Sequence, residues 1–206
     1  SGKTTITKLI TKFYEFNKGK ILIDGMDLNE IKLNNIRNKV GIILQDVFLF
    51  ADTIYNNISL YNDDISLKDV KKAARELEIH DFISSLPKGY DFNVSERGST
   101  LSSGQRQLIA FLRVLVNNPD ILILDEATSS IDSYSEDLIK NATKKITKDK
   151  TSIIIAHRLS TIESADKIIY MENGKILESG NHKQLLSIPN GKFKKLYEEQ
   201  FIDELV

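Results

Sequence analysis

The chain has 206 residues, of which 41% are hydrophobic and 28% are charged, with a formal net charge of -1 at pH 7. This length and composition can bury one sizeable core, or one core with a smaller lobe, so overall disorder is not expected. The near-zero charge implies no general affinity for nucleic acid or anionic lipid. Because the sequence has no cysteine, disulfides and thiolate metal sites are excluded.

The sequence opens on Ser1-Gly2-Lys3-Thr4-Thr5, without an initiating methionine. These residues look like the tail of a phosphate-binding loop whose earlier glycine and preceding strand are absent, so we expect a truncated piece. No apolar run approaches the roughly 20 residues of a spanning helix, and we expect any membrane attachment to lie outside this chain.

The first predicted element is a helix that begins at Lys3. Its apolar residues are spaced to form one face: Ile6, Leu9, Ile10 and Phe13. The N–H groups and the dipole at its N-terminus favour phosphate, with Lys3 as a point charge for the β and γ oxygens and Thr4 as a hydroxyl ligand for Mg²⁺. Gly-Lys-Thr also occurs at surface turns by chance, so the motif needs support from others.

A strand is predicted over 20–23, followed by a tight turn at Asp24-Gly25 and a short helix over 33–37. Residues 41–44 predict a buried strand. Gln45 follows it, and its neutral amide can ligate Mg²⁺ or orient water. The alternative is a loop glutamine bonded to backbone.

Helical patterns replace strand patterns from Leu60 to Gly98, which predicts a small helical lobe between two core strands. Ser66 and Asp69 resemble a capping box at the start of one helix, and a second short helix is expected from His80 to Leu86. His80 has no obvious partner nearby, which favours a surface or capping role over a ligand role.

Small residues crowd the start of the next predicted helix, at Leu101-Ser102-Ser103-Gly104-Gln105. Bare N–H groups and the Ser102 hydroxyl would form a second anion site there, and an ordinary Ser102 N-cap is the alternative. The helix has a core-facing stripe and ends at Asn117-Asn118-Pro119; the stripe is Leu108, Ile109, Phe111, Leu112, Leu115 and Val116.

Residues 121–124 are four consecutive aliphatic residues, which indicate a strand buried on both faces, as in a parallel sheet covered by helices. Asp125 and Glu126 stand at its C-terminal end, where open α/β sheets bind ligands. Two adjacent carboxylates at the end of this strand are suited to binding a metal ion and accepting a proton.

A helix over 135–146 and a third buried strand over 151–156 are expected next, with His157 directly after the strand. This histidine can bond a phosphate oxygen or hold a water, and a satisfied structural histidine is the alternative. Asn173-Gly174 predicts a hairpin turn, and the tail is expected to be helical with His182 facing solvent.

Together these motifs resemble the nucleotide-binding domain of ATP-binding cassette (ABC) proteins. Residues 1–5 look like the end of the Walker A loop, Gln45 the Q-loop, 101–105 the signature, 122–126 the Walker B strand, 129–132 the D-loop and His157 the switch histidine. Their order and spacing agree over nearly the whole chain. Residues 96–98 and 156–161 look most like the exporter branch.

The resemblance implies an α/β fold of the P-loop NTPase type, with a mainly parallel central sheet flanked by helices and an inserted helical subdomain. It divides the chain into a first part of the RecA-like core over 1–59 and the helical subdomain over 60–104. The signature helix and the second part of the core follow over 105–206.

The resemblance also implies that two such domains pack head to tail, each ATP lying between one Walker A loop and the partner's signature helix. Thr4, Gln45 and Asp125 would hold Mg²⁺, Asp125 through water. Glu126 would be the general base, and His157 and Gln45 would sense the γ-phosphate. The implied ATP-binding residues are Ser1, Gly2, Lys3, Thr4, Thr5, Ser102, Ser103, Gly104, Gln105 and Asp132.

The implied function is the ATP-binding and ATP-hydrolysing motor of an ABC membrane exporter, at the cytoplasmic face of the cell membrane. Its implied partners are a second nucleotide-binding domain, in a homodimer or heterodimer, and a transmembrane domain that contacts the Q-loop and the helical subdomain. No nucleic acid partner is expected. We expect the isolated chain to be impaired in ATP binding, since the first half of the loop and the adenine-stacking aromatic residue would lie upstream.

Two other classes stay open. A soluble ABC ATPase acting on nucleic acid or ribosomes would carry coiled-coil or basic insertions, and a regulatory subunit would not need Glu126. The signature region departs from the family at Ser103 and Ser95, which replace usual glycines, and at Leu108, which replaces a common arginine. If position 103 needs a positive φ, Ser103 would weaken the partner's site.

Overall fold

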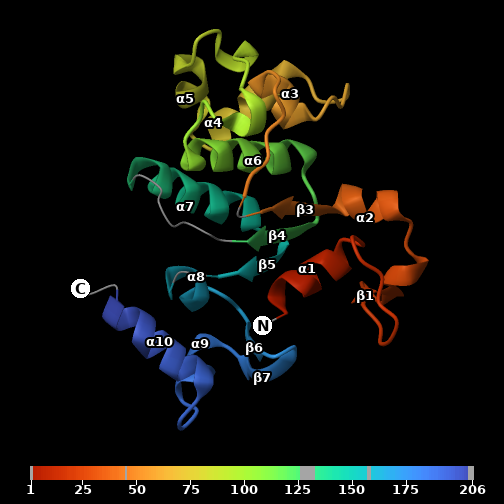
Figure 1. The fold of residues 1–206 in the computed structure, drawn as a ribbon, viewed down its shortest axis with the longest axis vertical. Helices are drawn as coiled ribbons and strands as arrows, with labels where there is room; N and C mark the ends of the chain where they lie inside the picture. The colour runs from red at the N-terminus through yellow and green to blue at the C-terminus, as the bar shows by residue number, and fades with distance from the viewer. Residues whose placement is uncertain (1, 45, 126–132, 157–158, 204–206) are drawn as a thin grey trace. The chain divides into compact units, whose positions relative to one another are not determined.

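The computed structural model describes residues 2–44, 46–125, 133–156 and 159–203. The chain forms two compact units, a smaller one of Ser1–Leu33 with Ile155–Val206 and a larger one of Asn34–Ile154. Each unit has its own helices and strands (Figure 1).

A three-stranded sheet with the order β3-β4-β5 runs through the larger unit. Strand β3 (Val40–Ile43) pairs in parallel with β4 (Ile121–Asp125), and β5 (Thr151–Ile155) runs beside β4 in the same direction (Figure 1). Side chains 122–124 of β4 are all buried, which confirms the prediction of an enclosed central strand. The predicted α/β class with a parallel sheet is therefore confirmed.

Helix α6 (Ser103–Asn117) packs on β3, and α7 (Ser133–Thr147) packs against α6. Leu108, Ile109 and Leu112 of α6 are almost completely buried, as their helical spacing predicts. Burial of each such side chain stabilises the fold by about 1.5–3 kcal/mol. Asn118 ends the helix in a left-handed conformation (φ 43°) just before Pro119.

The close approach of β3 to the end of α6 depends on Gly41. A Cβ atom at Gly41 would lie 2.6 Å from Cγ of Pro119 and 3.1 Å from Cγ1 of Val114. The 2.6 Å contact is shorter than real Cβ atoms make and the 3.1 Å contact is tight, so glycine lets the strand lie this close to the helix.

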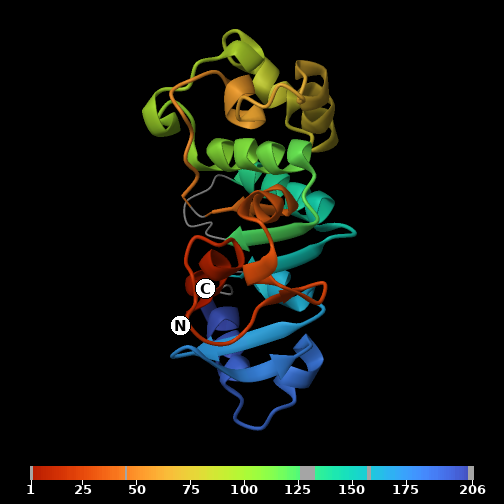
Figure 2. The same cartoon turned by 90° about the vertical axis from the view of Figure 1, so that its right-hand side faces the viewer.

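The helical lobe of the larger unit is built on α6 and consists of α3 (Ile54–Ser59), α4 (Leu67–Glu76), α5 (His80–Ser85) and the short 3-10 turns η2 (Gly89–Asp91) and η3 (Glu96–Gly98). Figure 2 shows α6 lying across the base of these helices. The predicted capping box is confirmed, because Ser66 Oγ accepts from the Asp69 N–H at 3.2 Å and Asp69 Oδ2 accepts from the Ser66 N–H at 3.1 Å. Helix α3 was not predicted.

Asn57 of α3 organises the segment that precedes this helix. Its fully buried side chain accepts from the Phe50 N–H (2.8 Å) and donates to the carbonyl oxygens of Phe50 (3.0 Å) and Thr53 (3.0 Å). Satisfied in this way, a buried amide holds the loop in one conformation, since breaking any of these bonds would leave a buried polar group without a partner.

The smaller unit contains α1 (Lys3–Ile10) and two antiparallel hairpins. The first hairpin joins β1 (Leu22–Ile23) to β2 (Met26–Asp27), and the second joins β6 (Ile168–Glu172) to β7 (Lys175–Gly180). Both turns have positive φ angles at their two central residues, at Asp24-Gly25 (49° and 81°) and at Asn173-Gly174 (50° and 74°), as predicted. The smaller unit also contains the 3-10 turn η1 (Leu28–Glu30) and the helices α8 (Leu159–Glu163), α9 (His182–Leu186) and α10 (Lys192–Asp203), whereas all of helix α2 (Leu33–Lys39) except its first residue belongs to the larger unit.

The predicted apolar face of α1 is wrong at its C-terminal end. The helix ends at Ile10, Phe13 lies beyond it and is 62% exposed, and the buried positions are Thr7 and Thr11. Thr11 Oγ1 donates to the Thr7 carbonyl oxygen at 2.8 Å, and a positive φ of 54° at Lys12 turns the chain away. Threonines can therefore line the buried side, because their hydroxyls bond to the helix backbone.

The prediction that His182 faces solvent is also wrong. Its ring packs edge-on against Phe193 and Tyr197, with ring centroids 6.0 and 5.0 Å apart. Its Nε2 is buried and has no hydrogen-bond partner among the described residues. In the described part of the chain, no helix combines the length and the apolar character needed to cross a bilayer.

Candidate nucleotide site

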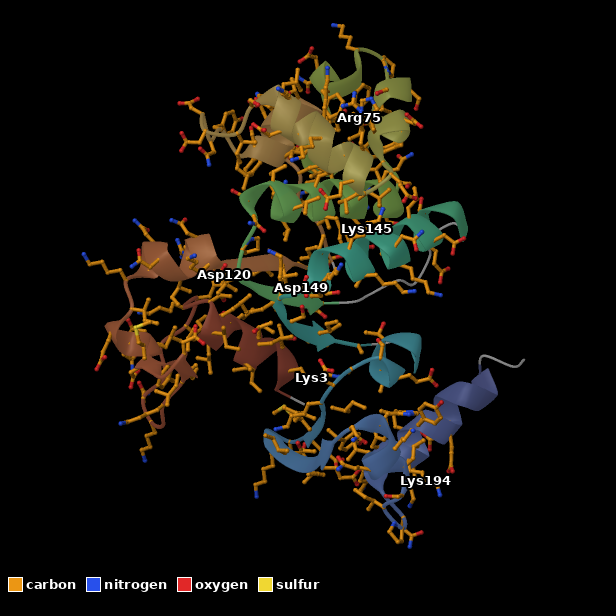
Figure 3. All side chains as sticks on the ribbon, turned by 180° about the vertical axis from the view of Figure 1, so that it is seen from behind. Lys3, Arg75, Asp120, Lys145, Asp149 and Lys194 are labelled. Atoms are coloured by element: carbon orange, nitrogen blue, oxygen red, sulfur yellow. The ribbon has the colours of Figure 1, made fainter. Side chains whose placement is uncertain are left out.

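The N-terminus of α1 has the features of a phosphate site. Gly2 is its N-cap residue, with a φ of 96° that residues with a side chain rarely adopt, and no side chain caps the helix. The side chains of Lys3, Thr4 and Thr5 are exposed in the first turn (Figure 3 labels Lys3). Because the first N–H groups of a helix have no acceptor within it, this end can hold an anion with Lys3 beside it. These residues fit a nucleotide phosphate.

The C-terminal ends of β3 and β4 lie side by side in the larger unit. The register pairs Ile43 with Leu124, so both strands finish at the same level of the sheet. Asp125 is the last residue of β4 and is half-buried. Its carboxylate thus stands at the sheet edge where parallel strands deliver ligand-binding groups.

Ser102 is the N-cap of α6. This is the ordinary capping role that the sequence offered as the alternative to an anion site. Its Oγ accepts from the Gln105 N–H at 3.2 Å, and Gln105 Oε1 accepts from the Ser102 N–H at 2.9 Å. The two side chains form a reciprocal capping box that fixes the start of the helix. Arg106 adds to this, because its Nη1 donates to the Leu101 carbonyl oxygen at 2.6 Å.

Ser103 does not need the positive φ that would make its side chain unfavourable. It is the first residue of α6 and is not among the non-glycine residues with positive φ. The condition under which Ser103 would strain the signature segment is therefore not met in this structure. Gly104, the next residue, is buried.

The structure describes part of the predicted site. Gly2, Lys3, Thr4 and Thr5 belong to the smaller unit, and Ser102, Ser103, Gly104, Gln105 and Asp125 to the larger one. Five predicted residues lie outside the described residues: Ser1, Gln45, Glu126, Asp132 and His157. That all of them share one cleft stays a prediction.

Sequence reasoning missed a set of exposed apolar side chains near the predicted Q-loop. Leu49 is fully buried, whereas its neighbours Phe48 and Phe50 are 53% and 46% exposed and pack edge to face at 5.2 Å. Alternation of burial within an all-apolar run is the signal that marks such a segment, because only one face of an extended chain can enter the core. Other exposed apolar side chains close to it in sequence are Leu44, Leu60 and Tyr61.

Comparisons with known proteins agree with this geometry. The family model described as ABC transporter matches residues 1–129. The alpha-hemolysin translocation ATP-binding protein HlyB of Escherichia coli O6:H1 is 52% identical over 200 residues, which is 97% of this chain and 28% of that protein. The putative multidrug export ATP-binding/permease protein YgaD of Bacillus subtilis is 46% identical over 196 residues, 95% of this chain and 34% of that protein.

A solved structure shows the same fold. It is described as a bacterial Atm1-family ABC exporter with ATP bound, and it superposes with a TM-score of 0.87 at 42% identity, covering 97% of this chain and 35% of that one. The chain thus spans about a third of the length of the proteins it matches. With the phosphate-competent start of α1, the parallel strands that end together and a family model that matches more than half of its residues, the chain belongs to the ABC transporter family.

Proposed function

We propose that this chain is the ATP-binding and ATP-hydrolysing motor of an ABC exporter, working at the cytoplasmic face of the cell membrane. The observation that carries the proposal is its 52% identity, over 97% of its length, to a protein named for ATP binding and hemolysin translocation. Both of the relatives described above are export proteins by name, which favours an exporter over a soluble ATPase acting on nucleic acid or ribosomes, and over a regulatory subunit.

In this proposal the start of α1 binds the triphosphate. Lys3 holds the β and γ phosphates, and the backbone N–H groups near Gly2 and Thr5 contact phosphate oxygens. Thr4, Gln45 and Asp125 hold Mg²⁺, Asp125 through water; Mg²⁺, when bound, neutralises charge that develops on the phosphates. Ser1, which precedes Gly2 in the sequence, is also proposed to contact the phosphates.

Glu126 is the proposed general base that orients the attacking water, and it directly follows Asp125 at the end of β4. His157 and Gln45 are proposed to sense the γ-phosphate, since each follows a strand of the same sheet within two residues. Phosphoryl transfer depends mainly on positioning and charge neutralisation, and these are the contributions that such side chains make.

A second nucleotide-binding domain is the proposed partner at the nucleotide. Ser102, Ser103, Gly104 and Gln105 would contact the partner's ATP, with Asp132 at the same interface. The capping box at Ser102 supports this role, because it holds the first turn of the 15-residue helix α6 rigidly and leaves the Ser102 and Ser103 side chains exposed. The partner can be an identical or a related chain.

A transmembrane domain is the proposed partner of the Q-loop and the helical lobe. The exposed pair Phe48 and Phe50 directly follows the Q-loop, and the Asn57 side chain holds the backbone of Phe50 in place. Exposed aromatic side chains on a rigid segment are typical of a protein interface.

The test uses the full-length transporter in membranes. We expect Glu126→Gln to retain ATP binding and to lose steady-state ATP hydrolysis by about a hundredfold or more, because the attacking water loses its base. Glu15→Gln, an equal change at an exposed loop carboxylate, is the matched control and should hydrolyse ATP normally. Normal turnover in Glu126→Gln would remove Glu126 from the role of base.

A further inference from the structure

A polar cavity of about 520 Å³, open to solvent, lies at the surface of the helical lobe and is lined by residues of α4, α5 and η2. None of its lining residues belongs to the predicted nucleotide site. Its polar lining is formed by Lys71, Arg75, His80, Ser84, Lys88 and Asp91, above the ring of Tyr90. Figure 3 labels Arg75 in this lobe.

The charges of this cavity are unbalanced. Lys71, Arg75 and Lys88 line the cavity together with one carboxylate, that of Asp91, and none of the three cations has an ion pair among the residues that the structure describes. Two nearby carboxylates are already engaged elsewhere. Glu78 pairs with Lys145 at 2.7 Å, and Asp69 accepts from the Ser66 backbone.

Two residues of the cavity lining, His80 and Tyr90, are joined by a part-buried hydrogen bond. The Tyr90 hydroxyl lies 2.8 Å from Nδ1 of His80, and the Tyr90 side chain is 5% exposed. Burial raises the pKa of Tyr90 to about 12, so at neutral pH its hydroxyl keeps its proton and can donate a hydrogen bond to Nδ1 of His80.

This bond orients the other imidazole nitrogen. In the tautomer in which Nδ1 accepts this bond, Nε2 carries the ring proton, and Nε2 lies 3.5 Å from the Ser84 hydroxyl. The Lys71 ammonium group lies 5.6 Å from the centre of the Tyr90 ring, within range of a cation–π interaction. Hydrogen-bond donors and a cation are therefore positioned before any ligand arrives.

We propose that this cavity binds the phosphate group of a small phosphate monoester, with Lys71, Arg75 and Lys88 neutralising it and His80 and Ser84 donating hydrogen bonds. Three cations against one carboxylate leave two positive charges, which matches the nearly doubly charged phosphate monoester at neutral pH. Arginine supplies the forked donor that suits phosphate oxygens. The cavity is larger than a bare ion needs and lies within the usual range for organic ligands, which leaves room for the ester group.

The test is a titration of the full 206-residue chain with glycerol 3-phosphate, followed by NMR of the histidine imidazole signals. The chain has three histidines, so His80→Gln assigns the relevant signal. Every sample carries Lys3→Ala, which removes the main phosphate-binding charge at α1 and makes the result independent of the proposed ATPase function. Glycerol serves as the uncharged comparator.

We expect a saturable shift of the His80 signal with glycerol 3-phosphate and none with glycerol. Lys71→Gln/Arg75→Gln should weaken binding by about tenfold or more. Lys68→Gln/Lys72→Gln removes two charges from the same helix outside the lining and should change binding by less than about threefold. Lys88→Gln, on a separate segment, should weaken binding as well.

Two results would overturn the proposal. One is a His80 signal that does not respond to glycerol 3-phosphate, or responds without saturation. The other is equal weakening by the two double substitutions, which would mean that the ester responds to the general charge of α4. Circular dichroism confirms that each variant is folded, as expected for exposed or half-buried side chains at these positions.

Discussion

Nε of Arg113 donates a 2.9 Å hydrogen bond to the carbonyl oxygen of Asn57, a residue 56 positions earlier in the chain. Its Nη1 and Nη2 both lie 3.4 Å from the Phe48 carbonyl oxygen. One side chain of α6 therefore holds both α3 and the segment after the predicted Q-loop. Helix α6 begins directly after Ser102. The same helix therefore carries the predicted signature at its start and, through Arg113, holds the segment that follows the predicted Q-loop.

Replacement of Arg113 is expected to loosen this connection. Burial lowers the pKa of the Arg113 guanidinium, because partial removal from water disfavours its charged form. We expect Arg113→Lys to lower the free energy of unfolding by about 1–3 kcal/mol, because a lysine cannot make the forked contacts. Urea unfolding of the full chain measures this. Arg75→Lys, at an exposed position of α4, should stay within about 0.5 kcal/mol of the unsubstituted chain, and equal losses in both variants would contradict the prediction.

Removal of the Ser102 cap is expected to destabilise the start of α6. Ser102→Ala loses the acceptor for the Gln105 N–H and should lower the free energy of unfolding by about 1 kcal/mol. Ser102→Thr keeps a hydroxyl acceptor and serves as the control. If chemical denaturation finds the alanine and threonine variants equally stable, the hydroxyl contributes nothing as a cap.

A methyl group at Gly41 is expected to push β3 away from the end of α6. Gly41→Ala should cost about 1–3 kcal/mol, because its Cβ would meet Pro119 at 2.6 Å. The double variant Gly41→Ala/Pro119→Ala removes the obstructing Cγ atom, so part of the loss should return. A double-mutant cycle by urea unfolding measures this coupling, and strictly additive effects would show that the two residues do not collide.

Tyr90 is expected to make stability fall at high pH. Its pKa is raised from 10.0 to about 12 in the folded chain, because burial disfavours the phenolate. Below pH 10 both states hold the proton; as the pH rises from 10.0 to about 12 only the unfolded state loses it, so stability is lost across this window. The Tyr90→Phe variant has no phenol proton to lose at this position. The difference in free energy of unfolding between the unsubstituted chain and this variant, measured with urea at increasing pH, should therefore shrink across this window. A difference that does not change with pH would contradict this.

Local patterns in the sequence predicted the elements whose geometry involves only neighbouring residues. The capping box at Ser66 and Asp69, the hairpin turn at Asn173-Gly174 and the end of α6 at Asn118 each depend on side chains or φ angles within a few positions. Strand β4 was equally clear, because four aliphatic residues in succession can be buried only inside a covered sheet.

Patterns of polarity were less informative where a polar side chain finds a partner far along the chain or in its own helix backbone. The sequence near His80 shows no obvious partner, yet its Nδ1 lies 2.8 Å from the hydroxyl of Tyr90, ten positions later in the chain. Thr7 and Thr11 occupy the buried side of α1 in place of the expected Phe13, since their hydroxyls bond to the helix itself. His182 was expected in water and instead packs between Phe193 and Tyr197.

By itself, then, the sequence determined the α/β class, the order of its main elements and the motifs that relate it to ABC transporters, because spacing along a chain decides local backbone geometry and which residues follow each strand. Only the tertiary structure decided that Arg113 joins α3 to α6, and that three cations line one cavity with His80 and Tyr90. The physical reason is that these contacts join helices through packing, and packing depends on how whole surfaces fit together.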